Sequence, residues 1–145
     1  MFEKSFLTAD EKKAIVAAIK DAEMCTSGEI RVHIEKATAG LSAVDRVKAV
    51  FAKQEMQKTK DRNGVLIYIA YESKSFAIWG DEGIHNQVGD AFWQAEMNLL
   101  KDYFSKDDFA QGIIHTVKEV GERLKLNFSY ERDDKNELSD EISEG

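Results

Sequence analysis

The chain has 145 residues, of which 43% are hydrophobic and 32% are charged, and this composition suits one soluble domain. Its net charge is −7 and no predicted face gathers lysines and arginines, so we expect no binding to DNA or RNA. Residues 1–14 carry charges of both signs without an apolar block, which is not typical of a signal peptide. No stretch approaches the length of a membrane span, and a lone Cys25 agrees with a reducing compartment. We therefore expect a cytoplasmic protein without a membrane span.

The first predicted element is a helix that begins after Thr8. Thr8 and Glu11 have the spacing of a capping box, in which each side chain bonds the backbone amide of the other residue. Residues 26–28 contain the polar and glycine residues that end such a helix. Residues 29–35 then alternate between apolar and polar side chains. This alternation predicts a peripheral strand with one buried face and one partly wet face.

A second helix, capped by Ser42, is predicted over residues 42–58. Residues 64–71 follow it and contain an unbroken apolar run, typical of a strand that is covered on both faces. Because strand-helix-strand units cross over right-handed, this strand should run parallel to the first one. Residues 75–80 return antiparallel and close a hairpin, which we expect in the middle of the sheet.

After the hairpin, the sequence predicts two helices and a tail. Residues 83–89 suggest a turn or short helical segment, and a long helix is expected from about Asp90. Residues 109–124 carry the apolar stripe of another helix. Residues 131–145 hold seven acidic residues against two basic ones, which predicts a flexible tail on a single domain of residues 1–130. The fold class is α/β, with a mixed central sheet and helices on both faces.

The predicted topology brings three polar motifs to one edge of the sheet. Residues 27–29 and 62–64 begin two parallel strands, and residues 80–82 end the strand that returns beside the second. These motifs supply three carboxylates and one amide oxygen, which are hard ligands that suit calcium or magnesium. The sequence therefore predicts a divalent-cation site at this edge. Its ligands would be Glu29, Asn63, Asp81 and Glu82.

Arg62 lies at the same predicted edge and could bind two oxygens of a phosphate group. With Asp81 as a metal ligand, this arrangement would suit metal-dependent hydrolysis of a phosphate ester, so Arg62 and Asp81 are the candidate catalytic residues. The alternative is that Arg62 forms a structural ion pair with Asp81 or Glu29. In that case, the protein would be a non-catalytic interaction or assembly module with a protein partner in place of a phosphorylated ligand.

Ser27 and the histidines are weaker candidates for a functional site. Ser27 is followed by Gly28 but lacks the Gly-x-Ser-x-Gly pattern of a nucleophile elbow, so we interpret it as part of the helix stop. The histidines do not have the spacing of zinc ligands, and the sequence predicts no zinc site. These histidines are His33, His85 and His115.

Four motifs in a fixed order resemble the TPM domain. They are residues 26–32, residues 62–70, residues 80–84, and the late pair of segments 136–138 and 140–142. The resemblance spans nearly the whole chain and implies a Rossmann-like three-layer sandwich. It also implies a link to a divalent cation, calcium in preference to magnesium, and to the acid phosphatase activity attributed to thylakoid members of photosystem II repair. The family's usual arrangement adds a signal peptide before the domain and a membrane span after it, and we expect neither here.

Overall fold

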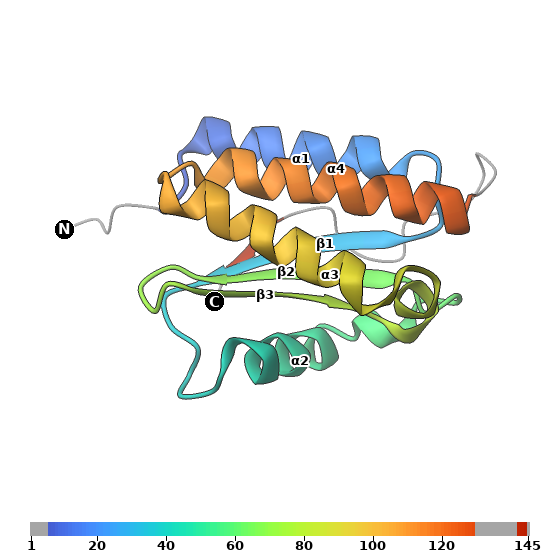
Figure 1. Ribbon diagram of the computed structural model, residues 1–145, viewed down its shortest axis with the longest axis horizontal. Helices are drawn as coiled ribbons and strands as arrows, with labels where there is room; N and C mark the ends of the chain where they lie inside the picture. Colours follow the sequence, from blue (N-terminus) through green and yellow to red (C-terminus); the bar gives the residue numbers. More distant parts are fainter. Residues whose placement is uncertain (1–5, 130–141, 145) are drawn as a thin grey trace.

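The computed structural model describes residues 6–129 and 142–144 and forms three layers (Figure 1). One helix covers one face of a central sheet, and three helices cover the other face. This architecture confirms the predicted α/β sandwich with helices on both faces. The strands are β1 (Glu29–Glu35), β2 (Gly64–Ala70), β3 (Ser75–Gly80) and β4 (Ser143–Glu144). The helices are α1 (Ala9–Glu23), α2 (Ala43–Lys53), α3 (Glu82–Ser105) and α4 (Phe109–Asn127), with a short 3-10 helix at Met56–Lys58.

The sheet is mixed and has the strand order β3-β2-β1-β4. β1 runs parallel to β2 with Glu29 opposite Gly64, and β3 runs antiparallel to β2 with Gly80 opposite Val65. The parallel pair and the hairpin are therefore confirmed. The position of the hairpin was predicted wrongly, because β3 is an edge strand and β1 lies inside the sheet. β1 gains its second neighbour from β4, a segment whose sequence gives no strand signal.

β2 is buried along its whole length because its side chains point alternately into two cores. One core lies between the sheet and the layer of α1, α3 and α4, and the other lies between the sheet and α2. An unbroken apolar run is what such a doubly covered strand requires. The first set is Val65, Ile67 and Ile69, and the second is Leu66, Tyr68 and Ala70.

The helix boundaries follow local signals. Thr8 and Glu11 form the predicted capping box at the start of α1. α2 ends at Lys53, earlier than predicted, and the chain continues into the 3-10 helix. Gly89, with φ of 77°, interrupts α3 and separates its first turns from the long helix, as the sequence predicted. Within the described residues, no helix combines the length and apolarity needed to cross a bilayer.

The second face of β1 is buried except at Arg31, which is half-buried, so this face is drier than predicted. His33 and Glu35 are each only 6% exposed, because Arg46 of α2 and Ser143 of β4 contact them. Alternation of apolar and polar residues gave the correct strand. It could not show that the polar side chains bond one another under a helix.

The end of the chain also differs from the predicted tail where the structure describes it. Ser143 and Glu144 pair with His33 and Ile34 of β1, and Ile142 packs against the core that contains α1 and α4. Residues 142–144 are therefore part of the fold. The rest of the predicted tail, residues 131–141 and 145, lies outside the described residues.

Candidate functional site

The three predicted motifs meet at one end of the sheet, which we call the polar edge and define as residues 27–29, 61–64 and 80–83. Here β1 and β2 begin, β3 ends and α3 starts (Figure 1). The Glu29 amide donates to the Asn63 carbonyl at 3.4 Å, and the Asp81 amide donates to the Gly64 carbonyl at 2.9 Å. The convergence that the topology predicted is therefore confirmed.

Arg62 and Asp81 form a two-pronged ion pair at the polar edge. The Arg62 Nε and Nη2 atoms donate to Asp81 Oδ2 at 2.7 Å and Oδ1 at 2.9 Å. The Asp81 side chain is 6% exposed, whereas the Arg62 side chain is 43% exposed. Arg62 Nη1 also lies 3.2 Å from Glu82 Oε1. These bonds to Asp81 raise the pKa of Arg62 above its usual value, so the guanidinium is the resident cation of this edge.

The backbone holds Arg62 in place at some conformational cost. Its φ of 51° lies in the left-handed region, which a side chain with Cβ adopts at a cost of roughly 1–3 kcal/mol and which is common at functional sites. The Arg62 amide donates to Thr59, and its carbonyl accepts from Gly83 at 2.8 Å. Asp81 is fixed from the other side because it is the N-cap of α3 and accepts from the Glu82 amide at 2.8 Å.

A second chain of polar contacts runs beside this pair. The Ser27 hydroxyl donates to Asp61 Oδ2 at 3.2 Å and accepts from Asn63 Nδ2 at 3.1 Å. Asn63 is 1% exposed, and its buried Oδ1 has no hydrogen-bond partner among the residues that the structure describes. An unmet buried acceptor is unfavourable by about 1–3 kcal/mol. Such an atom is a ready ligand for a cation or for a donor group.

The predicted ligand set is only partly assembled. Glu29 and Asp81 are 2% and 5% exposed, but the Glu82 side chain is 65% exposed and both Asp81 oxygens already bind Arg62. Within residues 6–129 and 142–144, no group of three or more His, Cys, Asp or Glu side chains is placed to hold a metal. Sequence reasoning also missed Asp61. Its position directly before Arg62, on the predicted edge, was the available signal.

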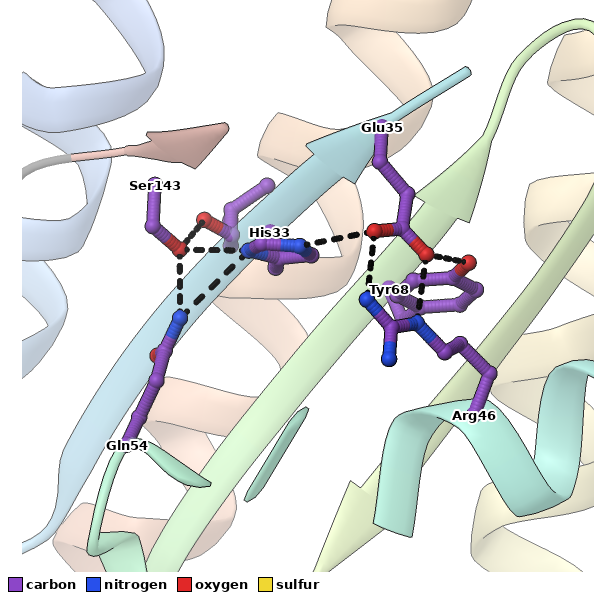
Figure 2. A network of polar contacts seen from close by, with 7 residues as sticks. His33, Glu35, Arg46, Gln54, Tyr68 and Ser143 are labelled. Carbon is purple, nitrogen blue, oxygen red and sulfur yellow. Dashed lines mark hydrogen bonds and ion pairs between the residues drawn. The ribbon is translucent and has the colours of Figure 1, made fainter. Parts of the chain in front are cut away.

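Figure 2 shows a separate polar cluster between the sheet and α2. Arg46 Nε and Nη2 donate to the two Glu35 oxygens at 2.7 and 2.9 Å, and the Tyr68 hydroxyl also donates to Glu35. The hydrogen bonds from Arg46 are the main reason that the pKa of Glu35 is lowered to about 2. His33 lies 3.4 Å from Glu35 and 2.9 Å from Ser143 Oγ. Burial lowers the pKa of His33, which favours the neutral ring.

This cluster is structural in character. Its Glu35 carboxylate is bonded on both oxygens, and Gln54 Nε2 donates to Ser143 Oγ at 3.0 Å (Figure 2). The contacts tie α2 and β4 to β1, and buried polar networks of this kind specify packing. Within the described residues, Gln54 Oε1 is the buried side-chain atom of this cluster that has no hydrogen-bond partner. The register of β1 on β2 places His33 opposite Tyr68, but from the sequence we predicted only that these strands are parallel, so this cluster was missed.

Comparisons with known proteins agree with this geometry. The model of the TPM domain family matches residues 2–123. The NMR structure of the BA42 protein from the psychrophilic bacterium Bizionia argentinensis is 45% identical and covers 99% of this chain and 99% of that chain, with a TM-score of 0.90. The N-terminal domain of the cg2496 protein from Corynebacterium glutamicum is 17% identical, covers 92% of this chain and 80% of that chain, and has a TM-score of 0.65, which shows a shared fold. No curated protein matches the sequence.

Proposed function

We propose that this chain, which belongs to the TPM domain family, binds a divalent cation at the polar edge, with calcium preferred to magnesium. The observation that carries the proposal is the buried Asn63 Oδ1, which has no partner within the described residues. The polar edge also carries the carboxylates of Glu29, Asp81 and Glu82, and an all-oxygen donor set suits calcium. The residues that would hold the cation are Glu29, Asn63, Asp81 and Glu82.

Cation binding in this account requires an exchange at Asp81. The Arg62 guanidinium neutralises Asp81 in the absence of a metal, and its exposed side chain can turn into solvent when a divalent cation takes its place. The positive charge of the cation then replaces that of Arg62 beside Asp81. The buried Asp81 carboxylate is therefore neutralised both with and without the metal. The edge can thus be stable both with and without the metal.

The direct test is a titration of the ¹⁵N-labelled protein with calcium and, separately, with magnesium, followed through backbone amide shifts. We expect saturable shifts confined to residues 27–29, 61–64 and 80–83, and tighter binding of calcium. Shifts that do not saturate, or that map to the acidic surface elsewhere, would contradict the proposed site.

Phosphatase activity is the second candidate, and Arg62 is the observation that favours it. A guanidinium released from Asp81 would lie at the same edge as the cation and can bind phosphoryl oxygens bidentately. We therefore expect phosphoserine to shift the Arg62 amide only when calcium is present. If phosphoserine has no effect in either condition, a non-catalytic module with a protein partner becomes the better account, while calcium binding itself stands or falls with the titration above.

A further inference from the structure

A pocket of about 700 Å³ lies at the opposite end of the sheet from the polar edge. Its walls are the β2-β3 hairpin, the turn that joins α3 to α4, and the residue Phe6 that precedes α1. In α/β sheets, ligands commonly bind beyond the carboxyl ends of the parallel strands, and β2 ends at this pocket. The volume also falls within the range of roughly 300–1,000 Å³ that is usual for small-molecule sites.

The pocket is lined by aromatic rings that pack on one another and remain partly exposed. The Phe6 ring stacks on Tyr71 with centroids 4.9 Å apart and an interplanar angle of 8°. Phe104 lies 5.0 Å from Phe76 and 5.1 Å from Phe109, at steeper angles. Ring faces and edges therefore form one continuous apolar surface. Such a surface favours a flat hydrophobic body, since aromatic contacts add to the gain from removing apolar area from water.

The charged side chains at the pocket favour a single negative charge on the ligand. Lys74, Lys101 and Asp107 line it, which leaves a local charge of +1 on a protein whose net charge is −7. Within the described part of the chain, neither Lys74 nor Lys101 forms an ion pair with an acidic side chain. Both ammonium groups are exposed and available to an anion. Asp107 would repel a second negative charge.

We propose that this pocket binds a small monoanion with a flat apolar body, of the aromatic carboxylate class. The body lies against the aromatic surface, and the carboxylate faces Lys74 and Lys101. This site shares no residue with the polar edge, so it stands independently of the cation proposal.

The probes that test it are 2-naphthoate, 2-naphthalenemethanol and 2-naphthylmethylammonium, which share one apolar body and differ in charge. We expect 2-naphthoate to shift the amides of Ala70, Tyr71, Ser75 and Ser105. The neutral alcohol should bind about five- to tenfold more weakly, as two exposed ion pairs would account for, and the ammonium should bind more weakly still. Equal affinity for the three probes, or no shifts in this region at millimolar naphthoate, would overturn the proposal.

Two variants test separately how the lysine charges and the space in the pocket contribute to binding. The double substitution Lys74→Gln and Lys101→Gln should reduce naphthoate affinity to that of the alcohol or below it, because Asp107 remains, and should leave the alcohol unaffected. Its matched control, Lys13→Gln with Lys60→Gln, removes two exposed lysines elsewhere and should change neither. Ser105→Phe places a ring in the pocket from an exposed helix end and should abolish binding of all probes. Undiminished naphthoate binding in the Lys74 and Lys101 variant, or in Ser105→Phe, would overturn the assignment.

Discussion

Arg62 is the residue on which the polar edge depends. It bonds both oxygens of Asp81 from a backbone conformation in the left-handed region. If it competes with a cation for Asp81, Arg62→Gln should raise calcium affinity, by roughly fivefold on the scale of a partly screened charge contact. Isothermal titration would measure this change. Lys58→Gln, which removes an exposed lysine paired with Glu55, should leave the affinity unchanged, and weaker binding in Arg62→Gln would make Arg62 part of the site.

Glu96 is the second residue with a testable charge state. Burial, and then the nearby carboxylate of Glu119, raise the pKa of Glu96 from 4.5 to about 7. The unfolded chain releases this proton at lower pH than the folded chain does. The contribution of Glu96 to the free energy of unfolding is therefore fully present below about pH 4.5 and is lost as the pH rises through about 7.

Glu96→Gln should abolish that loss. We expect the variant to exceed the wild type in free energy of unfolding by about 2 kcal/mol at about pH 8.5 and to match it near pH 4.5. Urea denaturation at both pH values provides the measurement. The control Glu122→Gln, at an exposed site on α4, should follow the wild-type profile. A wild-type-like profile for Glu96→Gln would show that this carboxyl is ionised in the folded protein.

At the scale of elements, β4 is the feature that local sequence patterns could not give. Its two residues complete the far side of β1, and its Ser143 hydroxyl contacts His33 and Gln54. Removing residues 142–145 exposes part of the core beneath Ile142 and leaves the buried His33 ring without Ser143. We expect the unfolding midpoint to fall by more than about 3 °C.

The control for this truncation is Glu144→Gln, which removes only the exposed ion pair with Lys12. Exposed pairs contribute little, so its midpoint should stay close to that of the wild type. Calorimetry would compare the three proteins. A truncated chain that melts with the wild type would return these residues to the flexible tail that the acidic composition predicted.

Gly83, in the first turn of α3, packs against the loop that carries Arg62. A Cβ at this position would lie 2.0 Å from the Asp61 carbonyl oxygen and 2.6 Å from that of Arg62. Helix propensity alone predicts that Gly83→Ala is stabilising by about 1 kcal/mol. The contact predicts the opposite sign, a loss of about 1–3 kcal/mol from overpacking, together with weaker calcium binding. Denaturant unfolding decides between them, and an unchanged or increased stability would contradict the tight contact.

At the scale of the whole molecule, much of the fold could be predicted from the sequence. The unbroken apolar run of β2 and the strand-helix-strand order fixed the parallel pair, and the hairpin then brought Asn63 and Asp81 to one edge. The rest depended on contacts that no local pattern records. The sequence left a pairing of Arg62 with Asp81 open as an alternative, but it did not predict the left-handed backbone from which Arg62 forms this pair. The burial of His33 requires partners from α2 and β4.

The two ends of the sheet also differ in how well they could be predicted from the sequence. The polar edge is built from short motifs that begin or end strands, so topology was sufficient to assemble it. The aromatic pocket gathers residues from β2, β3, α2, α3 and α4, from two turns, and from the segment before α1. Single apolar residues in those segments have the pattern of ordinary core. Partial exposure of the rings and the lysines beside them become visible only in three dimensions.

Thermal unfolding of the wild type and of Asp81→Ala, each in millimolar calcium and in chelator, tests the polar edge most directly. We expect calcium to raise the midpoint of the wild type, because a ligand of the folded state stabilises it. Asp81→Ala should lose about 1–2 kcal/mol in chelator, since α3 loses its N-cap and the half-exposed Arg62 loses its ion pair, and should gain nothing from calcium. The exposed control Asp90→Ala should respond as the wild type does. An undiminished calcium response in Asp81→Ala, or equal melting of the wild type in both conditions, would contradict a cation site at Asp81.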